Sequence, residues 1–345
     1  LFMAKNMAGD CNGNKVVIIT LTAGDEGNGA NTFGGAATPY YLAKETGAVY
    51  SSKFIRDFNN GSISPNNTYP LPTVSTVTIN SKNLKKYYYG DVGGSGAVVN
   101  YFLRLPSGNS NGAGYGTTGN QSLQRLKLGN IANMTSVDGA NTYTWSQLTS
   151  TIYAIVMAEK GTDNQVYINT ATQNTMTNPD HSDHYYSGMA AQEGVLANLA
   201  VGIREFVMDN SSTIPANLSN EELSDASALF GVYNWSLIRN RYSNALNTTV
   251  RNWLAMESFS NKRSPVGSLP VTLLDFSGKL KGNNVLLEWT TSFEINSKEF
   301  QIEKSTDGVT YSKLNTVAAA GNSFIEKKYN YLDAEATDIN YYRLK

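Results

Sequence analysis

Apolar runs and amphipathic stretches alternate along the first 260 residues of the chain. Short runs rich in β-branched residues predict strands at residues 15–21, 71–79, 97–105 and 165–169. Longer stretches with helical spacing predict helices at residues 38–58, 146–160, 186–208 and 219–242. This alternation predicts an α/β fold with a Rossmann-like, mainly parallel sheet flanked by helices.

Local signals define several ends of these elements. Thr38-Pro39 combines a capping residue with a proline at the first helical position. Ser219 and Glu222 have the spacing of a capping box, and Gly161 follows the second helix as a stop. A Gly/Asn/Ser-rich segment from Ser107 to Asn120 is long enough for a binding loop.

The pattern changes after residue 261. Residues 262–268 have the composition of a linker, and short alternating runs follow at residues 271–276, 284–289, 299–303, 311–317, 328–332 and 340–344. Asp307-Gly308 predicts a hairpin, and Trp289 has the pattern of a core residue. We therefore expect an α/β domain at 1–261, a linker at 262–268, and a smaller all-β sandwich of immunoglobulin type at 269–345.

Composition mainly excludes classes of function. The 345 residues include 27 basic and 28 acidic side chains, which leaves no electrostatic footprint for nucleic acid. The sequence contains no apolar stretch long enough to span a membrane, and a single cysteine excludes a disulfide framework within the chain. Only 16% of the residues are charged, which favours an exported protein.

The only two histidines of the chain lie in one window, His181-Ser-Asp-His184. Imidazole is a good zinc ligand, and a nearby carboxylate such as Asp183 can fix the tautomer and orientation of a histidine. One imidazole could bind metal while the other acts as an acid or stabilises an oxyanion. A polar loop with two solvated histidines remains the alternative, because a catalytic zinc also needs three protein ligands.

Further candidates lie near the expected carboxyl ends of strands, where ligands bind in α/β sheets. Asp25 and Glu26 follow the first strand and either line a pocket or cap a solvated turn. Lys44 and Arg104 could bind substrate hydroxyls or be ordinary packing charges. Tyr185 could stack on a sugar ring or pack in the core. Core positions are also expected for three tryptophans, Trp145, Trp235 and Trp253.

The segment Asn178-Pro-Asp-His-Ser-Asp-His184 resembles a motif of the PIG-L/LmbE-like de-N-acetylases. These are zinc-dependent enzymes that remove acetyl groups from N-acetylglucosamine-type substrates. The resemblance extends over about residues 1–260. It includes Thr20-Leu-Thr-Ala-Gly-Asp-Glu-Gly27, Lys44-Glu45 in place of an Arg-Glu pair, and Tyr101-Phe-Leu-Arg-Leu-Pro106.

This resemblance implies distinct roles within the histidine window. His184 matches a zinc ligand, His181 matches the histidine that stabilises the oxyanion and protonates the leaving amine, and Asp183 matches its orienting partner. The other ligands and the general base belong to a His-Pro-Asp-Asp motif, expected just before Leu1. We therefore expect this chain to be a fragment that by itself binds zinc poorly and is nearly inactive. The alternative is a non-catalytic exported carbohydrate-binding or surface protein that retains the fold.

The C-terminal segment resembles the fibronectin type III-like modules of exported Bacteroidetes proteins, through Leu269-Pro-Val-Thr-Leu-Leu-Asp-Phe276, Leu287-Glu-Trp-Thr-Thr291 and Tyr341-Tyr-Arg-Leu-Lys345. Such modules often precede a sorting signal read by the type IX secretion machinery, which we expect beyond Lys345 together with the last strand of the module. The resemblance implies a secreted or cell-surface protein whose C-terminal module is a spacer.

Overall fold

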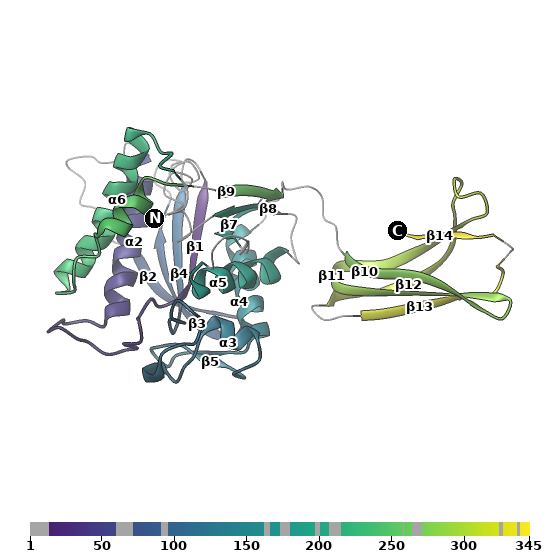
Figure 1. Cartoon of the computed structure of the whole chain (residues 1–345), viewed down its shortest axis with the longest axis horizontal. Coiled ribbons are helices and arrows are strands. Elements are labelled where there is room, and N and C mark those ends of the chain that lie inside the picture. The colour runs from purple at the N-terminus through teal and green to yellow at the C-terminus, as the bar shows by residue number, and fades with distance from the viewer. Residues whose placement is uncertain are drawn as a thin grey trace. The chain divides into compact units, whose positions relative to one another are not determined.

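The computed structural model describes residues 14–59, 72–90, 96–161, 166–172, 180–196, 201–206, 215–257, 259–263, 271–323, 327–336 and 339–345. Internal contacts divide the chain into two compact units, the first made of residues 1–195 and 201–265 and the second of residues 196–200 and 266–345 (Figure 1). Residues 264–268 of the expected linker and residues 178–179 of the histidine motif lie outside the described residues. No helix of the described part of the chain is long and apolar enough to cross a membrane.

The first unit combines helices and strands. Its strands are β1 (Lys15–Thr22), β2 (Thr73–Ile79), β3 (Lys82–Tyr89), β4 (Ala97–Leu105), β5 (Met134–Thr135), β6 (Thr142–Tyr143), β7 (Val166–Ala171), β8 (Val201–Phe206) and β9 (Phe259–Arg263). Its α-helices are α2 (Tyr40–Asn59), α3 (Leu123–Lys127), α4 (Trp145–Lys160), α5 (Ser182–Ala191), α6 (Asn220–Arg239) and α7 (Thr248–Leu254). The fold class is therefore mixed α/β, as predicted.

The strands of the first unit are mixed in orientation. The larger sheet has the order β1-β4-β3-β2, in which β1 and β4 are parallel while β3 is antiparallel to both neighbours. A second sheet has the order β7-β8-β9, with one parallel and one antiparallel pairing. The prediction of a mainly parallel sheet missed the antiparallel strand β3. The lysine-rich sequence Lys82-Asn-Leu-Lys-Lys at its start does not have the apolar pattern from which the other strands were predicted. Asn80 and Ser81, with φ of 50° and 59°, form the tight turn that folds β3 back on β2.

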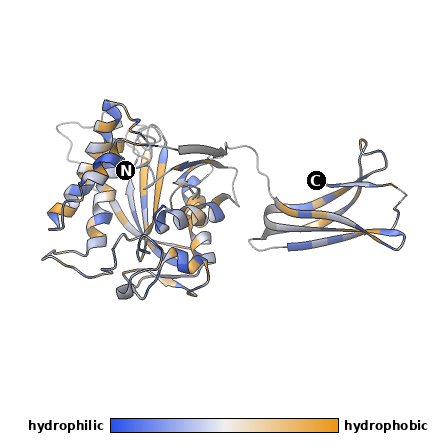
Figure 2. Cartoon of the chain, in the orientation of Figure 1, coloured by the Kyte–Doolittle hydropathy of each residue, from blue (hydrophilic) through white to orange (hydrophobic). Residues whose placement is uncertain are grey.

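The core of the first unit forms around β4. Eight of its nine residues are buried, as expected for a central strand. Val49 and Ile55 of α2 pack with Val98 of β4 and Phe230 of α6 in one hydrophobic cluster. Figure 1 shows α2 and α6 on one side of this sheet and α4 and α5 on the other, and in Figure 2 hydrophobic residues gather on the central strands. Helices α2 and α6 thus pack on β1 and β4, the strands that lead to the candidate site.

Most of the predicted helix ends agree with the structure. Ser219 and Glu222 form both hydrogen bonds of the capping box at the start of α6, and Gly161 follows the last residue of α4 with φ of 56°. The helix predicted over residues 186–208 is wrong beyond α5. A π-helical turn at Gln192–Leu196 follows α5, and Val201–Phe206 pairs in parallel with β7 instead of continuing the helix.

Two helical glycines are expected to respond in opposite ways to alanine. A Cβ on Gly188 of α5 would lie 2.3 Å from the carbonyl oxygen of Ala171 at the end of β7, whereas a Cβ on Gly231 of α6 would meet no atom within 4 Å. Gly188→Ala should therefore lower the free energy of unfolding by about 1–3 kcal/mol, because α5 has to move away from β7. Gly231→Ala should raise it by about 0.5–1 kcal/mol through helix propensity. Equal effects in denaturant melts would contradict this packing.

The second unit is all-β, as predicted. It consists of β10 (Val271–Lys281), β11 (Asn284–Ser305), β12 (Ser312–Ser323), β13 (Lys327–Asp333) and β14 (Tyr341–Leu344). The first part of the long β11 pairs with β10 and β13, and its last part pairs with β12 and β14. Two separately predicted runs thus belong to one strand. Trp289 is 1% exposed in the core, and the predicted turn at Asp307-Gly308 connects β11 to β12.

Candidate functional site

Asp25 joins the turn after β1 to the loop after β4. Its side chain is fully buried, and its Oδ1 accepts a hydrogen bond from the Ser107 main-chain N–H at 2.7 Å. Its Oδ2 accepts from the Gly29 N–H at 2.9 Å. Because β1 and β4 are neighbouring parallel strands, their carboxyl ends meet at one edge of the sheet. Asp25 therefore holds two loops together at the position predicted for a ligand site, and its carboxylate is used within the protein.

The same loop binds the histidine window. The Gly108 N–H donates to the Asp183 carboxylate, at 3.0 Å to Oδ2 and 3.2 Å to Oδ1. The Ser182 N–H donates to the Ser110 carbonyl at 3.1 Å. A Cβ on residue 108 would lie 2.5 Å from Asp183 Oδ1, so this approach requires glycine. The turn after β1, the loop after β4 and the start of α5 thus form one site.

Both imidazoles are oriented through their Nδ1 atoms. His181 precedes α5 as its N-cap, and its Nδ1 accepts from the Asp183 main-chain N–H at 3.1 Å. The proton of the neutral His181 ring is therefore assigned to Nε2. His184 Nδ1 lies 3.0 Å from Asp180 Oδ1, and the ring centroids of the two histidines are 5.3 Å apart. A metal or substrate would be bound through the Nε2 atoms of this pair.

The position of Asp183 differs from the sequence expectation. Its carboxylate was expected to orient His181, but both of its oxygens face the Gly108 N–H, and the carboxylate hydrogen-bonded to an imidazole is that of Asp180. Burial raises the pKa of the Asp183 carboxyl, against the opposing effects of the Gly108 N–H and the two imidazoles. The Asp183 carboxylate therefore anchors the loop after β4 to the start of α5.

Glu26 and Lys44 lie together at the rim of this site. Lys44 Nζ donates to Glu26 Oε1 at 2.8 Å and to the Gly24 carbonyl at 2.7 Å. The side chains of Lys44 and Glu26 are 20% and 58% exposed. Both ends of this ion pair are accessible from solvent, so the two residues remain candidates for substrate contacts.

Arg104 is held in a buried ion-pair network. Its guanidinium donates two hydrogen bonds to Glu45, at 2.6 and 2.8 Å, and a third to Asp138 at 2.7 Å. Glu45 is 4% exposed and also accepts from the Tyr87 hydroxyl at 2.7 Å. The donors of Arg104 are thus directed to protein carboxylates, which favours the packing role over the substrate-binding role for this residue.

Two tyrosines, Tyr185 and Tyr115, belong to the segments that form this site. Tyr185 is half-buried beside Tyr186, with ring centroids 5.0 Å apart in an edge-on arrangement. Tyr115, from the loop after β4, packs so closely on Gly27 that a Cβ there would lie 2.6 Å from the tyrosine ring. The sequence identified the loop but not Tyr115, although a tyrosine within a glycine-rich segment was a usable signal.

The Tyr115 hydroxyl lies near the carboxylates of the site. Burial raises the pKa of Tyr115, and the negative charges of Glu26, Asp25 and Asp183 raise it further. The protonated hydroxyl, which can donate a hydrogen bond, is therefore the stable form.

One pair of side chains in the histidine window has the geometry of a metal-binding histidine and its orienting carboxylate. The Asp180 carboxylate at Nδ1 of His184 is the arrangement that orients metal-binding histidines in proteins. Among the described residues, however, no group of three His, Cys, Asp or Glu side chains could hold a metal ion. Because a catalytic zinc takes three protein ligands, the described residues fit it only as the source of the His184 ligand.

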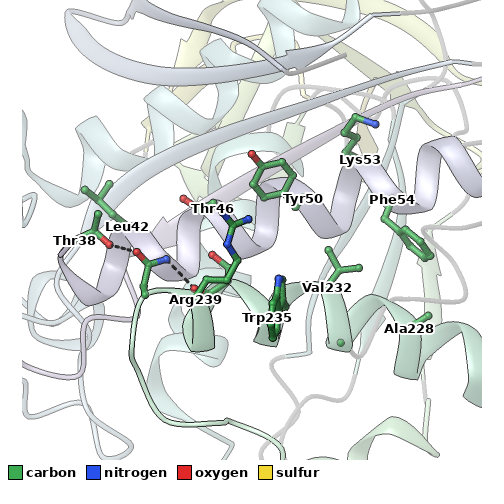
Figure 3. A pocket seen from close by; sticks show the side chains of 13 residues that line it. Thr38, Leu42, Thr46, Tyr50, Lys53, Phe54, Ala228, Val232, Trp235 and Arg239 are labelled. Atoms are coloured by element: carbon green, nitrogen blue, oxygen red, sulfur yellow. Dashed lines mark hydrogen bonds between the residues drawn. The ribbon is translucent and has the colours of Figure 1, made fainter. Parts of the chain in front are cut away.

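A groove separate from the histidine site lies between α2 and α6 in the first unit (Figure 3). It encloses about 1060 Å³, and Trp235, predicted as a core residue, is 58% exposed on its wall. Its lining contains no imidazole or carboxylate and none of the candidate residues of the histidine site. Its described lining therefore lacks the imidazole and carboxylate groups that bind zinc.

Comparison of the chain with protein-family models, with curated proteins and with solved structures finds no match. Its function has to be inferred from its own residues.

Proposed function

We propose that this chain is part of a zinc-dependent hydrolase that removes N-acetyl groups from N-acetylglucosamine-type sugars or glycoconjugates. The observation that carries the proposal is the pair of imidazoles at the start of α5, each oriented through Nδ1, in a window that Gly108 of the loop after β4 binds through Asp183. The resemblance of residues 178–184 to the PIG-L/LmbE-like motif supplies the reaction and the substrate class. In this proposal β1 and β4 belong to a Rossmann-like sheet.

His184 is the proposed metal ligand in this chain. Nδ1 is held by Asp180, so the metal would bind at Nε2 of this ring; in the family that the segment resembles, a His-Pro-Asp-Asp motif supplies the other ligands and the general base. Zinc, when bound, polarises the acetyl carbonyl and lowers the pKa of a bound water.

His181 is the proposed acid of the reaction. In its doubly protonated form, which gives up the hydrogen bond that Nδ1 accepts from the Asp183 N–H, the ring can donate from Nε2 to the oxygen that becomes negative during attack on the acetyl group; transfer of that proton to the leaving amine returns the ring to its neutral form. The Asp183 main-chain N–H contacts Nδ1 of this ring, and the hydrogen bonds from Gly108 to the Asp183 carboxylate fix the position of the residue.

Asp180→Asn is expected to weaken zinc binding by about 10- to 100-fold, because the carboxylate behind a ligand histidine fixes the ring and increases its basicity. The measurement is competition with a chromophoric chelator, using the protein extended upstream of Leu1. Asp225→Asn on α6 is the matched control, since it makes the same change of charge away from the histidine window. Equal zinc affinity of the two variants would contradict the role of Asp180.

The all-β unit is proposed to be a fibronectin type III-like module of an exported protein. Its buried Trp289 and long paired strands support a stable spacer, in keeping with the resemblance of this segment. Fractionation of cells that produce the full-length protein should find it in the medium or at the cell surface, delivered by a secretion machinery. Retention in the cytoplasm would contradict this.

A further inference from the structure

Three aromatic rings from distant parts of the chain form one cluster beside α2. The centroid of the Phe33 ring lies 5.4 Å from that of Tyr40 and 4.8 Å from that of Tyr242, and the two tyrosines are 4.8 Å apart. Tyr242 is 6% exposed, whereas Phe33 is 43% exposed. Phe33 is thus a large apolar ring held by two others and open to solvent. We call these three residues the aromatic platform.

The aromatic platform is connected to the rim of the histidine site. The Tyr40 hydroxyl lies 3.4 Å from Glu26 Oε1, and Lys44 Nζ lies 4.4 Å from the centroid of the Tyr40 ring. Glu26 directly follows Asp25, which binds the loop that holds the histidine window. An open aromatic ring, a carboxylate and an ammonium group therefore lie next to one another beside the site.

This combination matches the chemistry of a sugar ring. A sugar presents an apolar face of C–H groups, which packs on an aromatic ring, and a rim of hydroxyls that donate and accept hydrogen bonds. Glu26 can accept from such hydroxyls, and Lys44 can donate to them. Because the aromatic platform is linked to the histidine window through Glu26, Asp25 and the loop after β4, its ligand is a neighbour of the sugar that reacts.

We infer that Phe33 binds a second sugar ring of a glycan whose N-acetylated unit lies at His181 and His184. This inference rests on the proposed function and narrows its substrate to oligosaccharides or glycan chains. The groove between α2 and α6 also exposes a tryptophan, Trp235, but its lining has no carboxylate and includes none of the residues at the rim. This groove is the alternative binding site for the second sugar ring, and the tests below include it.

The first test is a ratio of rates measured with the zinc-loaded full-length protein. The probes are N-acetylglucosamine and its β-1,4-linked trimer. Phe33→Ala should lower the ratio of kcat/KM on the trimer to that on the monomer by about tenfold. Phe33→Tyr should restore the ratio, and Trp235→Ala should leave it unchanged. An unchanged ratio for Phe33→Ala, or a fall caused by Trp235→Ala, would overturn the inference.

The second test is binding without turnover. Calorimetric titration of the trimer into His184→Ala should show that adding Phe33→Ala raises Kd by about tenfold. If no acetate is released from any substrate but Phe33→Ala still weakens binding of the trimer, the hydrolase proposal is wrong and sugar binding by the aromatic platform is supported. If acetate is released and Phe33→Ala changes neither the ratio nor Kd, the aromatic platform fails and the hydrolase proposal stands.

Discussion

Replacing His184 by alanine is expected to lower kcat/KM for zinc-dependent release of acetate by at least about 10³-fold in the full-length protein. The loss follows because this imidazole would hold the metal that contributes several kcal/mol of transition-state stabilisation. The measurement is acetate release from N-acetylglucosamine-type substrates, together with the zinc content of each purified variant. Chelation of the wild-type protein should have the same effect.

His181→Ala is the matched comparison, since the chain has only two histidines and each variant removes one imidazole. Loss of an oxyanion donor should lower kcat by about 10²- to 10³-fold while the zinc content stays unchanged. Full activity of His184→Ala, or equal loss of zinc in both variants, would contradict the assigned roles.

Glu45→Ala is expected to be the most destabilising of the substitutions considered for the first unit, at about 3–5 kcal/mol. It leaves the largely buried Arg104 with one of its two carboxylate partners and removes the acceptor of the Tyr87 hydroxyl. It also removes a contact between α2 and β4 next to the candidate site. Hydrogen exchange of the β4 amides, measured by mass spectrometry, reports this loss locally.

Glu288→Ala in the second unit provides the control for Glu45→Ala. Glu288 also pairs with a cation, Lys279, at 2.8 Å, but this pair lies on the surface and is screened by solvent. Its removal should leave hydrogen exchange of both units nearly unchanged. If Glu45→Ala behaved like Glu288→Ala, the ion-pair network of Arg104 would not stabilise the fold.

Elements with a strong local signal could be predicted from the sequence. The apolar run of β1, the capping box before α6 and the glycine after α4 each determine structure through neighbouring residues. The lysine-rich β3 and the short β8 were missed, because a strand is stabilised by its partner as much as by its own residues. The mixed orientation of the larger sheet follows from β3.

The location of the candidate site could be predicted from the sequence, but the contacts between its residues could not. Asp25, Glu26 and the histidine window were expected near carboxyl ends of strands, and the structure joins these segments through the loop after β4. The Ser107 N–H that binds Asp25 and the Gly108 N–H that binds Asp183 each lie 75 or more residues from their carboxylate, which no local pattern encodes. For the same reason, the sequence could not show that Arg104 lies in an ion-pair network or that Phe33 lies beside Tyr242.

The most direct test of the proposed function is a crystal structure of the zinc-loaded full-length protein, with anomalous scattering recorded at the zinc edge. The expected result is one peak about 2.0–2.1 Å from His184 Nε2, with Asp180 still hydrogen-bonded to Nδ1 of the same ring. A zinc ion bound away from His184, or no zinc bound to a protein that releases acetate, would contradict the proposal.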